Sequence, residues 1–200
     1  MRRKEFELTD QAEIDALLNA AEYGVLSTID EAGFPQTLPV NFVWLEGKIC
    51  FHGAKAGEKA ANIARNAKAG FCVTRPLSLI PSYFSDPVLA CPATQYFVSV
   101  VVKGEAAVVE TAEEKAKILN ALMQKLQPEG GYAPLSADDE RYANMLKATA
   151  VYTLTPSSLT AKAKLGQNLP QERLLGLIGQ LEKRGGENDR ETAALMKRFL

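Results

Sequence analysis

The chain has 200 residues, of which 46% are hydrophobic and 24% are charged, a balance typical of a globular protein with a full core. The formal net charge of -1, with acidic and basic residues mixed along the chain, gives no general attraction to nucleic acid or to an anionic membrane. No apolar run approaches the roughly 20 residues that a membrane-spanning helix needs, and the N-terminus lacks an apolar signal region, so we expect a cytoplasmic protein.

Cysteine and histidine are scarce, which limits the chemistry that this chain can perform. Cys50, Cys72 and Cys91 lie far apart and form no C-x-x-C pair, so the sequence predicts neither a disulfide framework nor a zinc site. His52 is the only histidine, and any histidine-based catalytic triad or metal centre would have to use it. We therefore expect no bound metal.

The first part of the chain predicts one helix followed by a meander of short strands. A capping box at Asp10–Glu13 opens an amphipathic helix that ends near Gly24. Pro39 indicates an edge or a bulge in its strand. Strands this close together in sequence favour an antiparallel sheet or barrel over a doubly wound fold. The predicted strands are 25–29, 36–45 and 48–51, with turn residues at 30–33 and 46–47.

The segment from Phe51 to Lys59 carries the clearest chemical signal. A strand ends there in small residues, and a short helix begins at Gly57 and ends at about Asn66. Small residues let the backbone approach a ligand closely, and a helix start offers unpaired N–H groups that favour an anion such as phosphate. Lys59 gains nothing from the helix dipole in the first turn, which indicates a bound anion, although a plain surface lysine is the alternative. The P-loop ending Gly-Lys-Ser/Thr is missing.

The middle of the chain predicts two more strands separated by a long excursion. Residues 69–74 form a strand, and residues 76–93, with four prolines, form a surface loop. Residues 96–109 form the longest strand, in which Gly104 marks a bulge or bend. Ser99 is the polar member of an apolar run there, so it needs a hydrogen-bond partner from backbone or ligand.

The last third of the chain is predominantly helical. Residues 111–126 and 138–147 predict helices, and residues 150–154 predict a final strand. The segment 160–168 is polar with little periodicity. Two further helices are predicted at 171–184 and 188–199, joined at Gly185-Gly186, and their aliphatic residues dock on the body of the protein or on a partner chain.

Several of these blocks together resemble a known family. They are similar to the pyridoxamine 5'-phosphate oxidase-like family and, within it, to the nitroimidazole-resistance branch of flavin-nucleotide-binding proteins. The polar tail 162–168 resembles that of related FMN-binding regulators. The resemblance covers roughly residues 1–168, so we expect an FMN-binding domain there and a C-terminal helical extension at 169–200. The blocks that carry it are 23–28, 33–35, 38–43, 51–54 with Gly57 and Lys59, and 96–104.

The resemblance implies a mainly β (α+β) fold, an antiparallel split β-barrel with peripheral helices. It also implies a homodimer that binds FMN in two clefts at the subunit interface. By position, the strand 38–42 would line the isoalloxazine with its backbone, the segment around His52 would pass beside the flavin, and Lys59 would hold the phosphate. The cofactor-binding residues implied are Leu38, Pro39, Val40, Asn41, Phe42, Phe51, His52, Gly53, Ala54, Gly57, Lys59, Ser99, Gln167 and Asn168.

The sequence also departs from the family pattern. Glu58 stands where the family often has a basic residue, so one favourable charge near the phosphate is replaced by a repulsive one unless the side chain points to solvent. The basic residues with which the oxidase binds its substrate have no clear counterparts. We therefore do not expect oxidation of pyridoxamine phosphate.

Two classes of function follow from the resemblance. In the first, the protein is an FMN-dependent oxidoreductase that reduces a small molecule such as a nitro-aromatic or quinone, and His52 is a catalytic residue that polarises the substrate or donates a proton. A purely structural hydrogen bond from His52 is the alternative for that residue. In the second, the protein is a non-catalytic flavin carrier, sensor or regulator. Haem binding through His52 is a third possibility.

Overall fold

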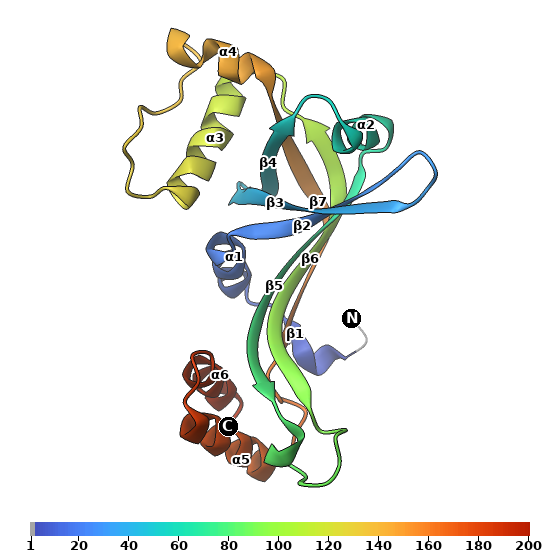
Figure 1. The fold of residues 1–200 in the computed structure, drawn as a ribbon, viewed down its shortest axis with the longest axis vertical. Helices are drawn as coiled ribbons and strands as arrows, with labels where there is room; N and C mark the ends of the chain where they lie inside the picture. The colour runs from blue at the N-terminus through green and yellow to red at the C-terminus, as the bar shows by residue number, and fades with distance from the viewer. Residues whose placement is uncertain (1–2) are drawn as a thin grey trace. The chain divides into compact units, whose positions relative to one another are not determined.

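Seven strands and six α-helices make up the computed structural model, which describes residues 3–200 (Figure 1). The strands are β1 (Glu7–Leu8), β2 (Tyr23–Ile29), β3 (Pro35–Leu45), β4 (Lys48–Ala54), β5 (Lys68–Ile80), β6 (Thr94–Val108) and β7 (Thr149–Lys164). The helices are α1 (Gln11–Ala20), α2 (Glu58–Arg65), α3 (Ala112–Leu126), α4 (Glu140–Ala148), α5 (Gln171–Arg184) and α6 (Asp189–Met196), with 3-10 turns at Lys4–Phe6, Ser82–Phe84 and Lys197–Phe199.

The strands form one sheet in the order β1-β7-β4-β3-β2-β5-β6, and an additional pairing of β7 with β6 closes this order into a ring. The ladders of β1 with β7, β2 with β3 and β5, β3 with β4, and β4 with β7 are all antiparallel. The expected antiparallel split-barrel fold with peripheral helices is therefore confirmed. None of the described helices has both the length and the apolar character needed to cross a membrane.

The chain divides into two compact units, and β5, β6 and β7 each contribute residues to both. We call the first the tail unit; it contains the described residues up to Asp10, then 74–100 and 160–200. We call the second the barrel unit; it contains 11–73 and 101–159. The boundary expected at residue 168 divides the chain into two consecutive segments, whereas each of these units is built from separate segments. That boundary stays a prediction.

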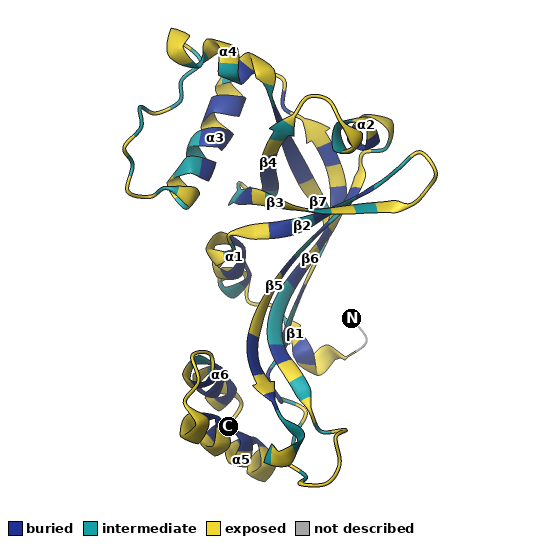
Figure 2. Ribbon diagram, in the orientation of Figure 1, coloured by how far each residue is buried: buried dark blue, intermediate teal, exposed yellow. Residues whose placement is uncertain are grey.

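The core of the barrel unit has two parts, because successive side chains of a strand point to opposite faces. One part holds aromatic side chains: Phe42 meets Phe71 edge to face at 4.9 Å, and Phe51 stacks on Tyr152 at 5.2 Å. The other part lies under α3 and α4 (Figure 2), where the apolar residues of the two helices cover β3, β4 and β7. Its buried members are Val43, Cys50, Val109, Ala116, Ile118, Leu119, Leu122, Leu146 and Val151.

In the tail unit, α5 and α6 pack on the ends of β5, β6 and β7 through a second apolar core. Gly185 takes a left-handed conformation, with φ of 65°, and ends α5, as the Gly185-Gly186 pair predicts. The helices that matched no known pattern in the sequence thus have a structural partner in this unit. The buried core residues are Leu77, Ile80, Tyr96, Ala163, Leu165, Leu174, Leu177, Ile178, Leu181, Ala193 and Met196.

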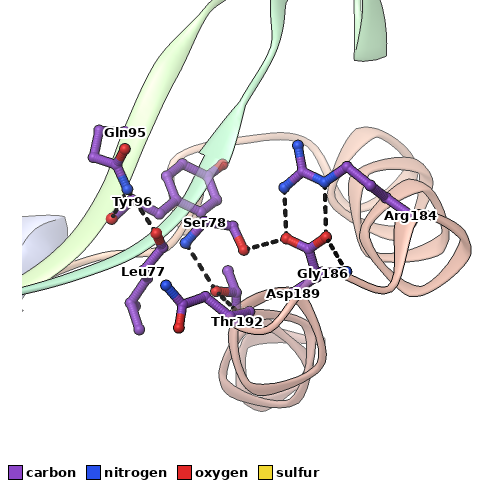
Figure 3. Close-up of polar contacts among 9 residues, drawn as sticks. Leu77, Ser78, Gln95, Tyr96, Arg184, Gly186, Asp189 and Thr192 are labelled. Carbon is purple, nitrogen blue, oxygen red and sulfur yellow. Dashed lines mark hydrogen bonds and ion pairs between the residues drawn. The ribbon is translucent and has the colours of Figure 1, made fainter.

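A buried polar network also fixes α6 to β5 (Figure 3). Asp189 is 2% exposed; it accepts two hydrogen bonds from Arg184, at 2.7 and 2.5 Å, and one from the Ser78 hydroxyl at 2.6 Å. The Gly186 amide donates to it at 2.8 Å, and Thr192 accepts from the Ser78 amide at 3.1 Å. The hydrogen bonds from Arg184 outweigh burial and hold the pKa of Asp189 well below its usual range.

Three expectations about the strands need correction. The excursion predicted at 76–93 is shorter, since β5 continues to Ile80 and a 3-10 turn follows. The strand predicted at 150–154 runs to Lys164. Its buried positions Ala161 and Ala163 are small and alternate with lysines, so the apolar side of the strand is hard to recognise in the sequence. Gly104 serves a close backbone approach: a Cβ there would lie 2.0 Å from the Thr155 carbonyl oxygen.

Candidate functional site

The candidate site lies in the barrel unit, where β3 and β4 separate. Their ladder extends from Leu45↔Lys48 to Phe42↔Phe51 and goes no further. Before Phe42, β3 pairs with β2, from Tyr23↔Asn41 to Ile29↔Pro35. Beyond Phe51, β4 continues on β7 up to Ala54↔Thr149. The two predicted flavin-lining segments, 38–42 and 51–54, therefore start from one point and diverge, leaving the edge of β3 that faced β4 without a ladder partner before Phe42.

Helix α2 begins just after β4 and is anchored on the hairpin of β2 and β3. Asn62 is 2% exposed, and its amide nitrogen donates to the Thr28 hydroxyl at 3.2 Å and to the Gln36 side-chain oxygen at 3.1 Å. Arg65 donates to the Ile29 carbonyl at 3.1 Å. These bonds fix the direction of α2, so its first turn has a defined place beside the end of β4.

Lys59 lies in that first turn and reaches back over β4. Its ammonium nitrogen is 3.4 Å from the His52 carbonyl oxygen and 5.5 Å from the ring centres of both Phe51 and Tyr152. No ion pair found among residues 3–200 involves Lys59. Burial lowers the pKa of this ammonium. A half-buried cation that holds only a carbonyl and two aromatic faces can still bind an anion.

Two glycines make this arrangement possible. A Cβ at Gly53 would lie 2.3 Å from the Lys59 ammonium nitrogen, so only glycine leaves room for that side chain. Gly57 precedes α2 with φ of 114°, a conformation that favours glycine, and it provides no side-chain cap. The first N–H groups of α2 are therefore not capped by the residue before them. Glu58, in the same turn, is exposed to solvent.

His52 lies on β4 opposite Val151 and is exposed to solvent. Partial burial by neighbouring atoms lowers its pKa, and the nearby charge of Lys59 lowers it further. The imidazole is therefore neutral at pH 7, with one nitrogen that donates and one that accepts a hydrogen bond. This is the only imidazole of the chain, and it lies on the same strand end as the carbonyl that Lys59 contacts.

The other predicted residues of β3 and β4 differ in how exposed they are and in whether their polar groups are already hydrogen-bonded. Phe42 and Phe51 are fully buried, backbone included, so neither presents an exposed surface to a ligand. Leu38 and Val40 are half-buried, and Pro39 and Asn41 are exposed. The Asn41 amide is engaged with the Glu22 carbonyl at 3.0 Å, and the Ala54 carbonyl accepts from the Tyr152 hydroxyl at 3.3 Å.

The remaining three predicted residues belong to the tail unit. Ser99 is half-buried on β6, and Asn168 is exposed after β7. Gln167 folds onto its own turn: its oxygen accepts from the Leu165 amide at 2.8 Å and its nitrogen donates to the Ala163 carbonyl at 2.6 Å. Their part in a cofactor site stays a prediction.

Sequence reasoning missed two residues that shape the site. Tyr152 lies beneath Lys59 because β7 pairs with β4 in the register Phe51↔Tyr152, and nothing local to residue 152 reveals this pairing. Asn62 orients α2, and nothing local reveals this role, because a polar residue in a short helix is usually exposed to solvent.

A model of the pyridoxamine 5'-phosphate oxidase family matches residues 10–163. No protein with curated information matches the chain. The structure is similar to a protein provisionally described as a 5-nitroimidazole antibiotic resistance protein from Bacteroides thetaiotaomicron, with 18% identity and a TM-score of 0.64 over 78% of this chain and 85% of that one.

Two further solved structures are similar over most of their length. The flavocytochrome Anf3 from Azotobacter vinelandii has 20% identity and a TM-score of 0.66, over 80% of this chain and 69% of that one. An FAD- and haem-binding protein from Mycobacterium smegmatis has 20% identity and a TM-score of 0.65, over 79% of this chain and 73% of that one. Together with the first structure they establish a shared fold.

Proposed function

The chain belongs to the pyridoxamine 5'-phosphate oxidase family, and on that basis we propose that it binds FMN as its cofactor. The observation that carries this proposal is the Lys59 ammonium, which is half-buried at the start of α2 and has no carboxylate partner among residues 3–200. Two structural neighbours add support, since one is named a flavocytochrome and the other an FAD- and haem-binding protein.

The residues present fit a flavin phosphate. Lys59 offers a full positive charge, and the first N–H groups of α2 offer hydrogen-bond donors beside it. Gly53 and Gly57 keep side chains away from the same space. Among residues 3–200, the edge of β3 without a ladder partner offers backbone donors and acceptors at 38–41, which suits the polar edge of an isoalloxazine.

We further propose that the protein is an oxidoreductase that reduces a small molecule such as a nitro-aromatic. When bound, FMN supplies the electron chemistry. His52 is exposed on β4, and its imidazolium form, which the lowered pKa favours only below pH 6.5, is the form that can donate a proton to the reduced substrate.

A homodimer with FMN at its interface is part of the same proposal. Val101 on β6 is 40% exposed, and the apolar stretch 96–102 to which it belongs favours a covering partner. Sedimentation at micromolar concentration tests this, and a flavin-loaded protein that stays monomeric would contradict it. We also propose a cytoplasmic location, and no disulfide joins Cys50, Cys72 or Cys91 among residues 3–200.

The cofactor proposal is tested by comparing FMN with riboflavin. Lys59→Met should weaken FMN by roughly 10- to 100-fold, because a charge-assisted hydrogen bond to the phosphate is lost. Riboflavin, which lacks the phosphate, should bind both proteins alike. Lys68→Met, at an exposed lysine of the same unit, is the matched control and should leave both affinities unchanged. Equal losses for FMN and riboflavin would place the phosphate elsewhere.

The oxidoreductase proposal is tested separately, by single-turnover reoxidation of the reduced flavoprotein with a nitro-aromatic. His52→Gln should slow this step by roughly 100-fold if the imidazole supplies the proton, while FMN stays bound within about tenfold. A rate unchanged in the variant would assign His52 a structural role. Reoxidation no faster with the nitro-aromatic than with oxygen would favour a flavin carrier or regulator. A purified protein whose absorbance spectrum shows haem and no flavin would contradict the flavin proposal.

A further inference from the structure

A separate cavity of the barrel unit has no place in the proposed function. It has a volume of about 380 Å³ and lies at the start of α3, beside the end of α4 and the segment that follows β4. This is the lower part of the size range of small-molecule pockets. Its lining consists of Lys55, Glu110, Ala112, Lys115, Ala137, Ala143, Leu146 and Lys147.

The inner wall of the cavity contains a buried ammonium. Lys115 is 7% exposed, and its nitrogen donates to the Leu146 carbonyl at 3.4 Å and to the Thr149 carbonyl at 3.3 Å. These carbonyls belong to the last turn of α4 and to the residue that follows it, so they hold the side chain in place. An ammonium has three N–H donors, and these two bonds use two of them. Both bonds are long, and neither partner carries the negative charge that a buried cation favours.

The charges around this cavity do not balance. Lys55 and Lys147 lie at its exposed rim, and Glu110 is the only acidic residue of the lining. Neither rim lysine takes part in an ion pair among residues 3–200, whereas Lys117, elsewhere on α3, is paired with Glu46 at 2.5 Å. Three cations around one carboxylate produce a positive field that a cavity concentrates. The alanines and Leu146 leave room for a short apolar body.

We propose that this cavity binds a small dianion, such as a phosphate monoester or a dicarboxylate, as a second ligand independent of FMN. Lys115 bonds one anionic group at the inner wall, and Lys147 and Lys55 neutralise the charge at the rim. Glu110 opposes the anion and limits its affinity. The alanines of the lining offer no side-chain hydrogen bonds and little shape selection. The charge of the ligand therefore decides which molecules bind.

The test is calorimetric titration with glycerol 3-phosphate and, separately, with succinate, each up to about 10 mM and each with and without saturating FMN. We expect at least one probe to bind with an affinity that FMN leaves unchanged, and the tighter of the two identifies the anionic group. Lys147→Gln and Lys55→Gln should each weaken binding by about threefold to fivefold. Glu110→Gln should tighten it by a similar factor.

A control variant and three contrary outcomes complete the test. Lys183→Gln, at an exposed lysine of α5 outside this cavity, should leave binding unchanged. The proposal is overturned if neither probe binds, or if saturating FMN abolishes binding, which would make the cavity part of the flavin site. It is also overturned if Lys147→Gln and Lys183→Gln behave alike. None of these variants removes the buried Lys115, so loss of the fold does not confuse the result.

Discussion

Asp189 in the tail unit and Lys59 in the barrel unit are both charged groups withdrawn from water, but their surroundings differ in kind. Asp189 accepts hydrogen bonds from a guanidinium, a hydroxyl and an amide, which together match its charge (Figure 3). Lys59 has one carbonyl at 3.4 Å and the faces of two aromatic rings. The first group is fully partnered within the protein, and the second is not.

This difference separates a structural charge from a functional one. The partners of Asp189 lower the pKa of its carboxyl, so the folded state favours the charged form. Burial lowers the pKa of the Lys59 ammonium, so the folded state disfavours the charged form. A group that opposes folding in this way is expected where a ligand supplies the missing partner. The network around Asp189 instead holds α5 and α6 in place and leaves nothing for a ligand to bind.

The largest expected effect follows from removing the charge of Asp189. Asp189→Asn should lower the free energy of unfolding by about 3 kcal/mol, because Arg184 and Ser78 lose a charged acceptor in a buried place. Urea denaturation measures this. Glu191→Gln on the same helix is the control: the Glu191 pair with Arg75 is exposed, so the loss should stay below about 1 kcal/mol. If both variants lose a similar free energy of unfolding, the buried network stabilises the fold no more than an exposed ion pair does.

Acid should remove the same stabilisation without a mutation. The pKa of Asp189 is lowered in the folded state from an ordinary 3.8, so its stabilisation is complete above that value and declines as the pH falls through 3.8 and below. Urea midpoints measured at about pH 5.5 and about pH 3 should therefore differ more for the unchanged protein than for Asp189→Asn. Parallel declines in the two proteins would contradict the assignment.

A smaller effect is expected from displacing the unpartnered charge. Gly53→Ala places a Cβ against the end of the flexible Lys59 side chain, so the ammonium moves at little cost to the fold. FMN affinity should fall by about tenfold, since a displaced charge keeps part of its attraction to phosphate. Thermal stability should barely change. Gly70→Ala, where a Cβ meets only ordinary contacts at 3.8 and 3.9 Å, should alter neither property.

The smallest effect concerns the single imidazole, which gives one histidine signal in proton NMR. Its pKa should lie below 6.5 and should rise in Lys59→Met, because the lysine charge disfavours the imidazolium. The rise should stop short of 6.5, since burial is the larger cause. FMN phosphate, by neutralising Lys59, should act in the same direction. A pKa unaffected by the mutation would mean that the two groups do not interact.

The lowered pKa of His52 also has a consequence for stability. In the window just below 6.5 the unfolded chain binds more protons than the folded one, so stability rises with pH there. Asp189 acts in a lower window, near and below 3.8, and the two contributions can therefore be separated along one pH series.

Local patterns in the sequence determined the class of fold and the candidate anion site. Alternating apolar residues with turn signals at 30–33 and 46–47 predicted the β2–β3–β4 meander, because strand periodicity and turn chemistry act over a few residues. The same is true of helix ends: Thr111 caps α3 by accepting from the Glu114 amide at 3.3 Å, and Gly185 ends α5. The small residues before Lys59 likewise marked a helix start open to an anion.

Only the tertiary structure decided which distant residues share an environment. Ser78 and Asp189 are 111 residues apart, and Tyr152 reaches Lys59 only through the register of β4 on β7. The full lengths of β5 and β7 depend in the same way on their partner strands. Strand pairing and the packing of helices on a sheet are non-local, and residues near each other in the chain carry no record of them. The sequence therefore indicated Lys59 as a candidate anion site, whereas the structural role of Asp189 depends on Ser78, which only the tertiary structure brings beside it.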